Sequence, residues 1–160
     1  MKIRNIVILV IGILVLTQVS FGAQVRKGSM LFTGQVAIFD DEHGHFGIGG
    51  NLEYGIARSF TLGGDVCIVT GDSNKKIDDT GLLLSPSFNY HFDISDKNLD
   101  VFVGGGFFMY FYFKGDPRMD LKGFGGIRYY FSPKWAGCFR LLVGGDGFGG
   151  ALGVTYRVKK

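Results

Sequence analysis

The chain has 160 residues, with 17 Lys and Arg against 14 Asp and Glu and a formal net charge of +3. This length is enough for one domain and too short for two. The 16 Phe and 7 Tyr exclude a disordered chain, and without a cluster of Lys and Arg that could neutralise a run of phosphates, nucleic acid is not an expected partner.

The first residues have the pattern of a secretory signal peptide. Lys2 and Arg4 form a short positive region, an apolar run follows, and small residues precede Gln24. The apolar run is short for a membrane-spanning helix and no stop-transfer segment follows, although an uncleaved anchor is the alternative. We therefore expect export, with a signal peptide at 1–23 and one domain at 24–160. Loss of the two basic residues leaves 15 basic against 14 acidic side chains, a net charge of +1.

Period-two alternation of apolar and small or polar residues recurs through the rest of the chain. It is clearest from Gly44 to Thr70, where a corner at Arg58 and Ser59 joins two alternating runs and indicates an antiparallel hairpin. Glycines fall inside these runs, where they allow strands to bend and a small barrel to close. The expected strands cover residues 29–39, 46–57, 60–69, 81–92, 99–113, 119–131, 135–145 and 148–158.

The charged residues of these strands share one face, and the opposite face is essentially uncharged. The charged face also holds Gly and Ala, which suits a crowded interior better than a solvated exterior. We therefore predict an all-β fold, an eight-stranded antiparallel up-and-down transmembrane β-barrel preceded by a signal peptide. A soluble periplasmic barrel that binds an apolar ligand is the alternative, because it would also alternate with period two. The predicted polar network of the lumen comprises Glu53, Asp65, Asp100, Lys122, Arg128, Arg140 and Arg157.

Aromatic residues gather where the strand order places the short turns. A ring of aromatic side chains at one membrane interface is typical of transmembrane barrels. The predicted aromatic girdle comprises Tyr54, Phe60, Tyr90, Phe92, Tyr129, Phe131, Trp135 and Tyr156.

Three stretches carry a resemblance to a known family. The runs SPSFNYHF (85–92), GGIRYYFSPKWAGCFRLLVGG (125–145) and GGALGVTYRV (149–158) resemble the small eight-stranded outer-membrane β-barrels of Gram-negative bacteria, the group that includes porin-family and surface-antigen-like proteins. The resemblance implies a location in the cell outer membrane, contact with membrane lipid and insertion by the outer-membrane assembly machinery.

The last strand is similar to the assembly signal of that family. Gly153, Tyr156 and Val158 stand at the expected alternation. The chain departs from the family pattern in ending on Lys159-Lys160 instead of an aromatic residue, and its outward loops are short. Short loops argue against a large adhesive surface.

Opposite charges inside so narrow a barrel predict a plug. An eight-stranded barrel has an interior just wide enough for side chains to fill, so the inward acidic and basic residues are expected to neutralise one another. A narrow ion or solute path is the alternative. The function expected from this arrangement is a structural or surface-exposed, non-catalytic role for a monomeric barrel without cofactor or metal.

Other candidate sites receive plainer interpretations. The segment Asp40 to His45 gathers possible metal ligands, but no second cluster with recognised spacing accompanies it, and a solvated turn is favoured. Cys67 and Cys138 are expected on strands across the barrel from each other, too far apart for a disulfide, and therefore as buried free thiols. The glycine-rich stretches 104–106 and 144–150 precede no helix, so they mark strand bends and not a phosphate cradle.

A lipid-modifying barrel enzyme is the runner-up function. Such an enzyme needs a Ser close to a His and an acidic residue. His91, Ser85 and Ser87 share a face, but that face is expected to point inward and to be structural. A Ser and His pair facing outward near one rim would favour the enzyme.

Overall fold

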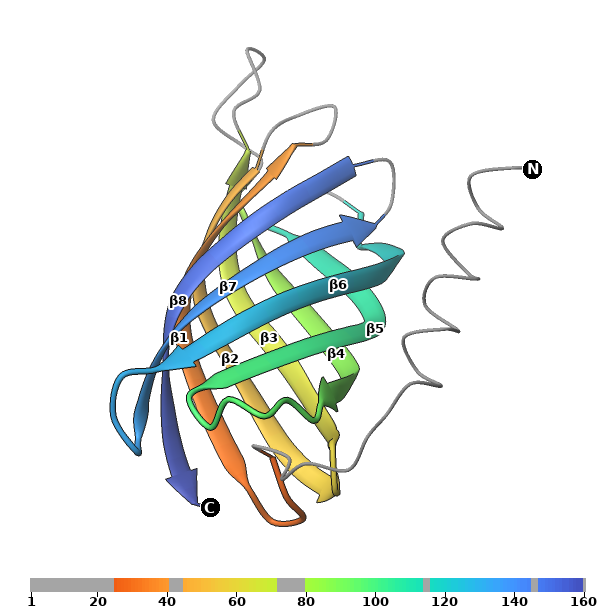
Figure 1. Ribbon diagram of the computed structural model, residues 1–160. Coiled ribbons are helices and arrows are strands. Elements are labelled where there is room, and N and C mark those ends of the chain that lie inside the picture. The colour runs from red at the N-terminus through yellow and green to blue at the C-terminus, as the bar shows by residue number, and fades with distance from the viewer. Residues whose placement is uncertain (1–24, 41–44, 72–79, 114–115, 145–146, 160) are drawn as a thin grey trace, which may run out of the picture.

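Eight antiparallel strands form the whole of the described structure (Figure 1). The computed structural model describes residues 25–40, 45–71, 80–113, 116–144 and 147–159. The expected signal peptide and most of the Asp40–His45 segment, including the side chains at both of its ends, lie outside the described residues. Among the residues described, no helix is long and apolar enough to cross a membrane. The strands are β1 (Met30–Asp40), β2 (His45–Ala57), β3 (Phe60–Gly71), β4 (Gly81–Phe92), β5 (Leu99–Tyr112), β6 (Arg118–Tyr130), β7 (Trp135–Gly144) and β8 (Gly147–Lys159).

The sheet closes on itself. Each strand pairs with its neighbours in sequence, and β1 also pairs with β8, with Thr33 opposite Thr155 at the closing seam. Closure leaves no strand with an unpaired edge, as a wall in contact with lipid requires. The predicted strands differ from the observed ones by only a residue or two at their ends. The all-β, eight-stranded up-and-down barrel expected from the sequence is confirmed.

One ladder is interrupted. Between β4 and β5 the pairing runs from Leu84 opposite Met109 to Ser87 opposite Gly106, and it skips Ser85 and Pro86. Proline has no backbone N–H to donate, so the interruption falls where the sequence makes a ladder hydrogen bond impossible.

One end of the barrel carries the tight connections 58–59, 93–98 and 131–134, and is called here the short-turn end. The β2–β3 turn is tight enough to hold Ser59 at a φ of 66°. The segment 25–29 folds against this turn, because the Gly28 amide donates to the Gly55 carbonyl at 2.7 Å and the Gly55 amide donates to Ser29 at 2.8 Å. The chain therefore enters the barrel at the short-turn end, where β8 also finishes (Figure 1).

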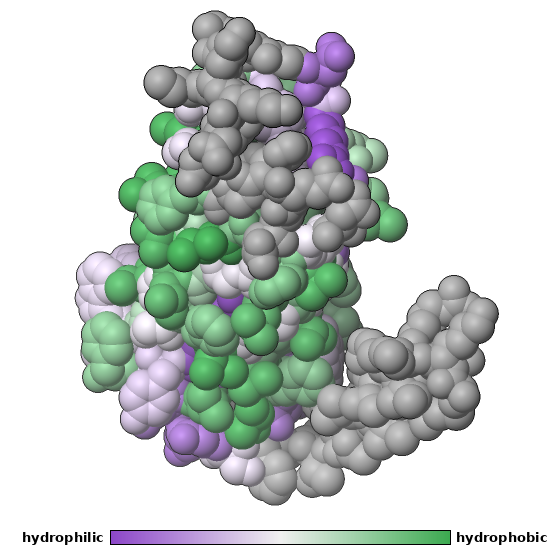
Figure 2. Space-filling model, turned by 90° about the horizontal axis from the view of Figure 1, so that it is seen from above, coloured by the Kyte–Doolittle hydropathy of each residue, from purple (hydrophilic) through white to green (hydrophobic). Residues whose placement is uncertain are grey.

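The outer surface of the wall is apolar. Large side chains at alternate positions are more than half exposed, among them Leu62 at 51%, Ile68 at 56% and Leu152 at 60%. Figure 2 shows apolar residues in green over much of the described surface. A soluble monomer rarely exposes an apolar area of this extent, whereas lipid covers it without cost. The prediction that the apolar face points outward is confirmed.

The interior is less uniformly polar than the alternation predicts. Phe102, Phe108 and Tyr110 of β5 are buried inside the barrel and pack with Leu83 and Phe124 in one apolar cluster. The inner face of β5 is aromatic because the lumen needs bulk as well as charge to be filled.

Arginine at position 141 tests which face meets lipid. Leu141 is 57% exposed on the outer face of β7. In Leu141→Arg we expect insertion to fail or weaken, because a mid-bilayer Arg on a lipid-facing strand costs about 2–4 kcal/mol. The measurement is the folded fraction in lipid vesicles, read from gel mobility before and after boiling. The control is Phe113→Arg, at the rim of the barrel away from the short-turn end. It should cost at most about 1 kcal/mol, because the penalty for an Arg falls near the membrane interface. Equal folding of wild type and Leu141→Arg would contradict the assignment.

Candidate functional site

All seven charged residues of the predicted lumen network point into the barrel. None is more than 7% exposed, and Asp100 and Arg128 are fully buried. Alternation places them there, since each follows or precedes an outward apolar residue on a twisted strand. The structure does not join the seven into one network. It separates them into two groups and one isolated arginine.

The first group is a closed ring of four side chains, called here the Glu53 ring, made of Glu53, His91, Asp100 and Arg128. Arg128 donates from Nη1 to Asp100 Oδ2 at 3.0 Å and from Nη2 to Glu53 Oε1. The imidazole of His91 places Nδ1 2.8 Å from Asp100 Oδ1 and Nε2 3.4 Å from Glu53 Oε2. The ring draws on β2, β4, β5 and β6, so it crosses the lumen near the short-turn end.

The geometry of the Glu53 ring favours a charged His91. A carboxylate accepts hydrogen bonds and does not donate, so a carboxylate oxygen near each nitrogen favours an imidazole that is protonated on both. The Thr61 hydroxyl, 3.2 Å from Nε2, is a second partner of that nitrogen. Two carboxylates then face two cations and the ring is neutral. Thr61 adds a hydrogen bond from its hydroxyl to Glu53 Oε2 at 3.2 Å. The predicted network does not include His91, although its place on the inward face, in step with the acidic residues, indicates that it can join them.

The second group is called here the Asp65 cluster, made of Asp65, Lys122, Arg140, Gln35 and Ser85. Lys122 Nζ lies 2.5 Å from Asp65 Oδ2 and donates to Ser85 at 2.8 Å. Arg140 Nη2 contacts Asp65 Oδ1 at 2.6 Å and also donates to the side-chain oxygen of Gln35. The amide nitrogen of Gln35 donates to Asp65 Oδ1 at 2.9 Å.

The Asp65 cluster has one more cation than it has carboxylates. Aromatic rings offset part of this excess, since Lys122 Nζ lies 4.7 Å from the centre of the Phe124 ring and 5.3 Å from that of Phe108. A cation over an aromatic face gains roughly 2 kcal/mol or more when both are desolvated. The inward aromatic residues and the charges therefore stabilise each other.

Arg157 stands apart from both groups. Its guanidinium carbon lies 4.1 Å over the Tyr130 ring, and within the described part of the chain no carboxylate reaches it. Among the described residues the expected mutual neutralisation of the lumen is therefore incomplete, both at Arg157 and in the Asp65 cluster.

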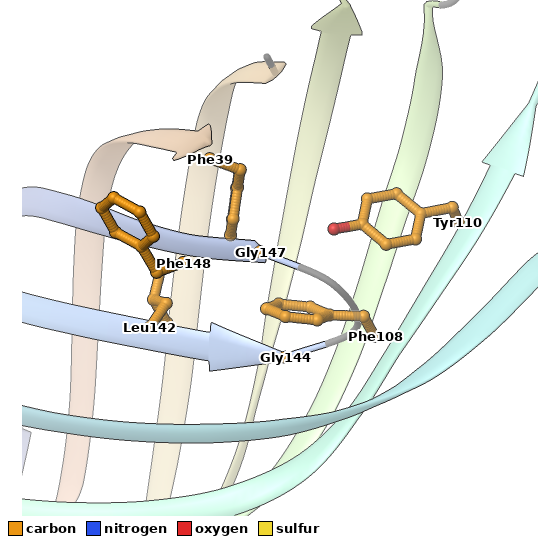
Figure 3. Close-up of a pocket in the computed structure, with 7 residues that line it drawn as sticks. All are labelled: Phe39, Phe108, Tyr110, Leu142, Gly144, Gly147 and Phe148. Atoms are coloured by element: carbon orange, nitrogen blue, oxygen red, sulfur yellow. The ribbon is translucent and has the colours of Figure 1, made fainter. Parts of the chain in front are cut away.

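Towards the end opposite the short turns the lumen becomes apolar and opens into a small pocket (Figure 3). Phe39, Phe108, Tyr110, Leu142 and Phe148 line it, and the rings of Phe108 and Tyr110 point into it. The cavity has a volume of about 20 Å³ and is partly open to solvent. The rings of Phe39 and Phe108 meet edge to face with centres 5.5 Å apart. The described residues of the lining include no acidic or basic side chain, so they offer mainly apolar contacts.

The predicted aromatic residues lie around the outside of the short-turn end. Trp135 and Tyr156 pack with ring centres 4.8 Å apart, and Phe60, Tyr90 and Phe92 form a row with successive centres 5.1 Å apart. The other members of the girdle, Tyr54, Tyr129 and Phe131, are 47–65% exposed. Five of the eight predicted girdle residues therefore contact one another, as one pair and one row of three.

Of the three assembly-signal residues, one has a separate structural reason for its identity. Tyr156 and Val158 face outward on β8, whereas Gly153 faces the lumen. A Cβ at position 153 would lie 2.9 Å from Thr33 Cγ2 and 3.0 Å from Gln35 Cβ. Close approach of β8 to β1 therefore requires glycine there.

The candidate catalytic residues have structural contacts in the lumen. His91 and Ser85 are held in the two charged groups, and His91 and Ser87 are buried in the lumen. Within the described ranges no group of three His, Cys, Asp or Glu side chains is placed to hold a metal ion. Cys67 and Cys138 are both buried and free, as expected.

A closed antiparallel barrel with charges inside and apolar side chains outside defines the class of transmembrane β-barrels. Comparison of structures places the chain among solved members of that class. The outer-membrane protein OprG of Pseudomonas aeruginosa matches with a TM-score of 0.62 at 10% identity over 86% of this chain and 100% of that one. Neisserial surface protein A matches with a TM-score of 0.58 at 14% identity, over 82% and 96%.

A de novo designed transmembrane β-barrel matches as well as the natural proteins do, with a TM-score of 0.59 at 17% identity over 83% of this chain and 98% of that one. At such identities the likeness shows the fold alone. No protein-family model and no curated protein matches the chain. The chain has the fold of the small outer-membrane β-barrels, and the outer-membrane location implied by the resemblance agrees with these neighbours.

Breaking the Glu53 ring should destabilise the barrel more than breaking an exposed ion pair. Removing one partner of a buried pair strands the other charge, so we expect Glu53→Gln and Arg128→Met each to cost about 3–5 kcal/mol. The double variant keeps Asp100 and His91 as a neutral pair and should cost less than the sum of the two. The measurement is urea unfolding in vesicles.

The matched control for this cycle is Arg58→Gln. Arg58 pairs with Asp93 at 2.7 Å, but its side chain is 59% exposed. The expected cost is at most about 1 kcal/mol. Additive effects of the Glu53 and Arg128 substitutions would contradict the direct contact between them.

The two thiols should be protected until the barrel unfolds. Cys67 and Cys138 are at most 6% exposed, and Gln35 Nε2 lies 3.7 Å from the sulfur of Cys67. We expect no maleimide labelling of the folded protein, labelling of both thiols after boiling in detergent, and no change of gel mobility with reductant. Rapid labelling of either thiol in the folded protein would show that water reaches the lumen freely.

Proposed function

We propose that this protein is an integral outer-membrane barrel with a structural or surface-exposed, non-catalytic role, whose lumen is plugged by polar side chains. The observation that carries the proposal is the Glu53 ring. Four side chains from four strands meet across the lumen near the short-turn end and satisfy one another's charges.

The Asp65 cluster supports the plug at a second level of the barrel. It links β1, β3, β4, β6 and β7 through direct side-chain hydrogen bonds. A permeating ion would have to displace both groups, and each broken buried pair costs several kcal/mol. A closed lumen therefore has more support than a narrow path.

The non-catalytic role is supported by how the polar residues are used. A nucleophilic mechanism needs a serine within reach of a histidine that is free to accept its proton. Both nitrogens of His91 face carboxylates, and Ser85 accepts a hydrogen bond from Lys122. The described residues thus offer no activated serine.

The partners follow from the two surfaces. The proposed lipid contact uses the exposed apolar residues of all eight strands, and the proposed contact with the assembly machinery uses Gly153, Tyr156 and Val158 of β8. Closure of β1 on β8 favours a monomer, since no strand edge is left for a second copy.

Two measurements on the refolded mature protein test the proposal. Gel mobility should change on boiling, as expected for a closed membrane barrel. In a planar bilayer the wild type should carry no sustained current, whereas a variant that removes a charged pair at each level, Glu53→Ala with Arg128→Ala and Asp65→Ala with Lys122→Ala, should conduct more. A sustained wild-type current that this variant leaves unchanged would contradict the plug, and mobility unaffected by boiling would contradict the barrel.

A further inference from the structure

The two ends of the barrel carry opposite charge. The short-turn end holds five exposed basic residues, called here the basic rim: Arg26, Lys27, Arg58, Lys97 and Lys134. The acidic residues of the same turns are Asp93 and Asp96. With Lys159 and Lys160, at and just after the end of β8, the sequence gives this end seven basic residues against two acidic ones, a net charge of +5.

The opposite end is acidic. Its segments 40–45, 72–80, 114–120 and 145–146 hold nine acidic and four basic residues in the sequence, a net charge of −5. Part of this end lies outside the described residues, and its charge follows from the sequence alone. The lumen adds three acidic and four basic residues. The net charge of +1 expected for the mature chain therefore combines two rims of opposite sign with a nearly neutral interior.

The basic rim encircles the end of the barrel. Its residues lie in the segment that leads into β1 and in all three turns of this end, 58–59, 93–98 and 131–134 (Figure 1). Backbone hydrogen bonds fix two of these positions. The Ser29 amide donates to the Arg26 carbonyl at 2.9 Å, and the Arg157 amide donates to the Lys134 carbonyl at 2.8 Å. A compact anion contacts only one part of such a ring, whereas a planar layer of negative charges faces all of it at once.

The basic rim lies beside the aromatic girdle, and therefore at the level of the lipid headgroups. Lys134 directly precedes Trp135, which is 46% exposed on the outer face, and Arg58 stands two residues before Phe60. Since a strand advances about 3.3 Å per residue, both cations begin within about 7 Å of rings that mark the membrane interface. Lys and Arg side chains are long enough to reach headgroup phosphates from there.

We propose that the basic rim binds anionic phospholipid headgroups in the membrane leaflet that surrounds the short-turn end. One basic side chain near an anionic membrane surface gains about fivefold in affinity. The largest contributions come from Arg26, Lys27 and Lys134, because Asp93 lies 2.7 Å from Arg58 and offsets its charge. The acidic end is repelled by the same lipid, so the preference is confined to one end. The inference rests on the membrane location of the barrel and is independent of whether the lumen is plugged.

Trp135 is the single tryptophan of the chain and reports which lipid lies next to the basic rim. The mature protein is refolded in vesicles of equal parts phosphatidylcholine and phosphatidylglycerol, with bromine on the acyl chains of one lipid or of the other. Bromine quenches tryptophan fluorescence on contact, so the two quenching values give the lipid preference at Trp135. At low ionic strength we expect about a fivefold preference for phosphatidylglycerol. The preference should fall at about 1 M salt, where the screening length is about 3 Å.

Variants assign the preference to the basic rim. Lys134→Gln removes the cation next to Trp135 and should remove most of the preference for phosphatidylglycerol. Adding Arg26→Gln and Lys27→Gln should make quenching by the two brominated lipids equal. All three side chains are exposed, so the barrel should still fold. Each variant is first shown to be folded by its mobility change on boiling, which separates loss of the lipid preference from loss of the membrane barrel.

The matched control is Arg118→Gln, which makes the same change of net charge at the opposite end. Arg118 is 50% exposed and lies at the start of β6. This variant should keep the wild-type preference for phosphatidylglycerol. An equal loss in Arg118→Gln and Lys134→Gln would overturn the proposal in favour of an effect of the total charge.

Two further results would contradict the binding of lipid. Equal quenching of the wild type by both brominated lipids at low ionic strength would overturn the proposal outright. If, in addition, soluble dextran sulfate bound the detergent-solubilised wild type and not the triple variant, the basic rim would be assigned to a soluble polyanion instead. A preference for phosphatidylglycerol that the triple variant retains in full would show that the rim is not its cause.

Discussion

Backbone hydrogen bonding in a medium without water is the constraint on which this structure depends. A strand in lipid must pair along both edges, and only a closed sheet provides that for all eight strands. Once the wall is closed, period-two alternation sends every second side chain into a narrow lumen. The strong alternation of the sequence and the crowding of the interior are thus two results of one requirement.

Crowding then decides how the charges are arranged. Seven charged side chains and a histidine share a space that side chains fill completely, so each carboxylate is enclosed by cations from several strands. With His91 protonated the Glu53 ring is neutral, because its imidazole lies beside two carboxylates at once. The Asp65 cluster keeps one excess positive charge, which is partly stabilised by the contacts of Lys122 with the ring faces of Phe108 and Phe124. Aromatic residues that break the simple polar-inside pattern are what allow the cations to remain inside.

The sequence predicts the strands, their order and the facing of each charged residue, because alternation and turn chemistry are local. It does not predict which charges meet. Arg128 and Glu53 are 75 positions apart, and their contact depends on barrel shear and side-chain length. For the same reason the predicted network lacks His91, which the structure brings into the Glu53 ring, and includes Arg157, which lies apart from both groups. The alternation of Phe102, Phe108 and Tyr110 along β5 can be read from the sequence, but the contact of Phe108 with Lys122 requires the closed barrel.

The gap in the β4–β5 ladder makes the contact between these two strands the weakest strand pairing in the wall. At Ser85 and Pro86 two successive residues of β4 make no ladder pair with β5, while the neighbouring ladders are continuous there. Beside the gap the hydroxyl of Ser87 is buried without an acceptor among the described residues. If the barrel opens locally, β4 and β5 should separate first along this line. The amide protons of β5 near Phe107 should therefore exchange with solvent faster than the other amide protons of the wall.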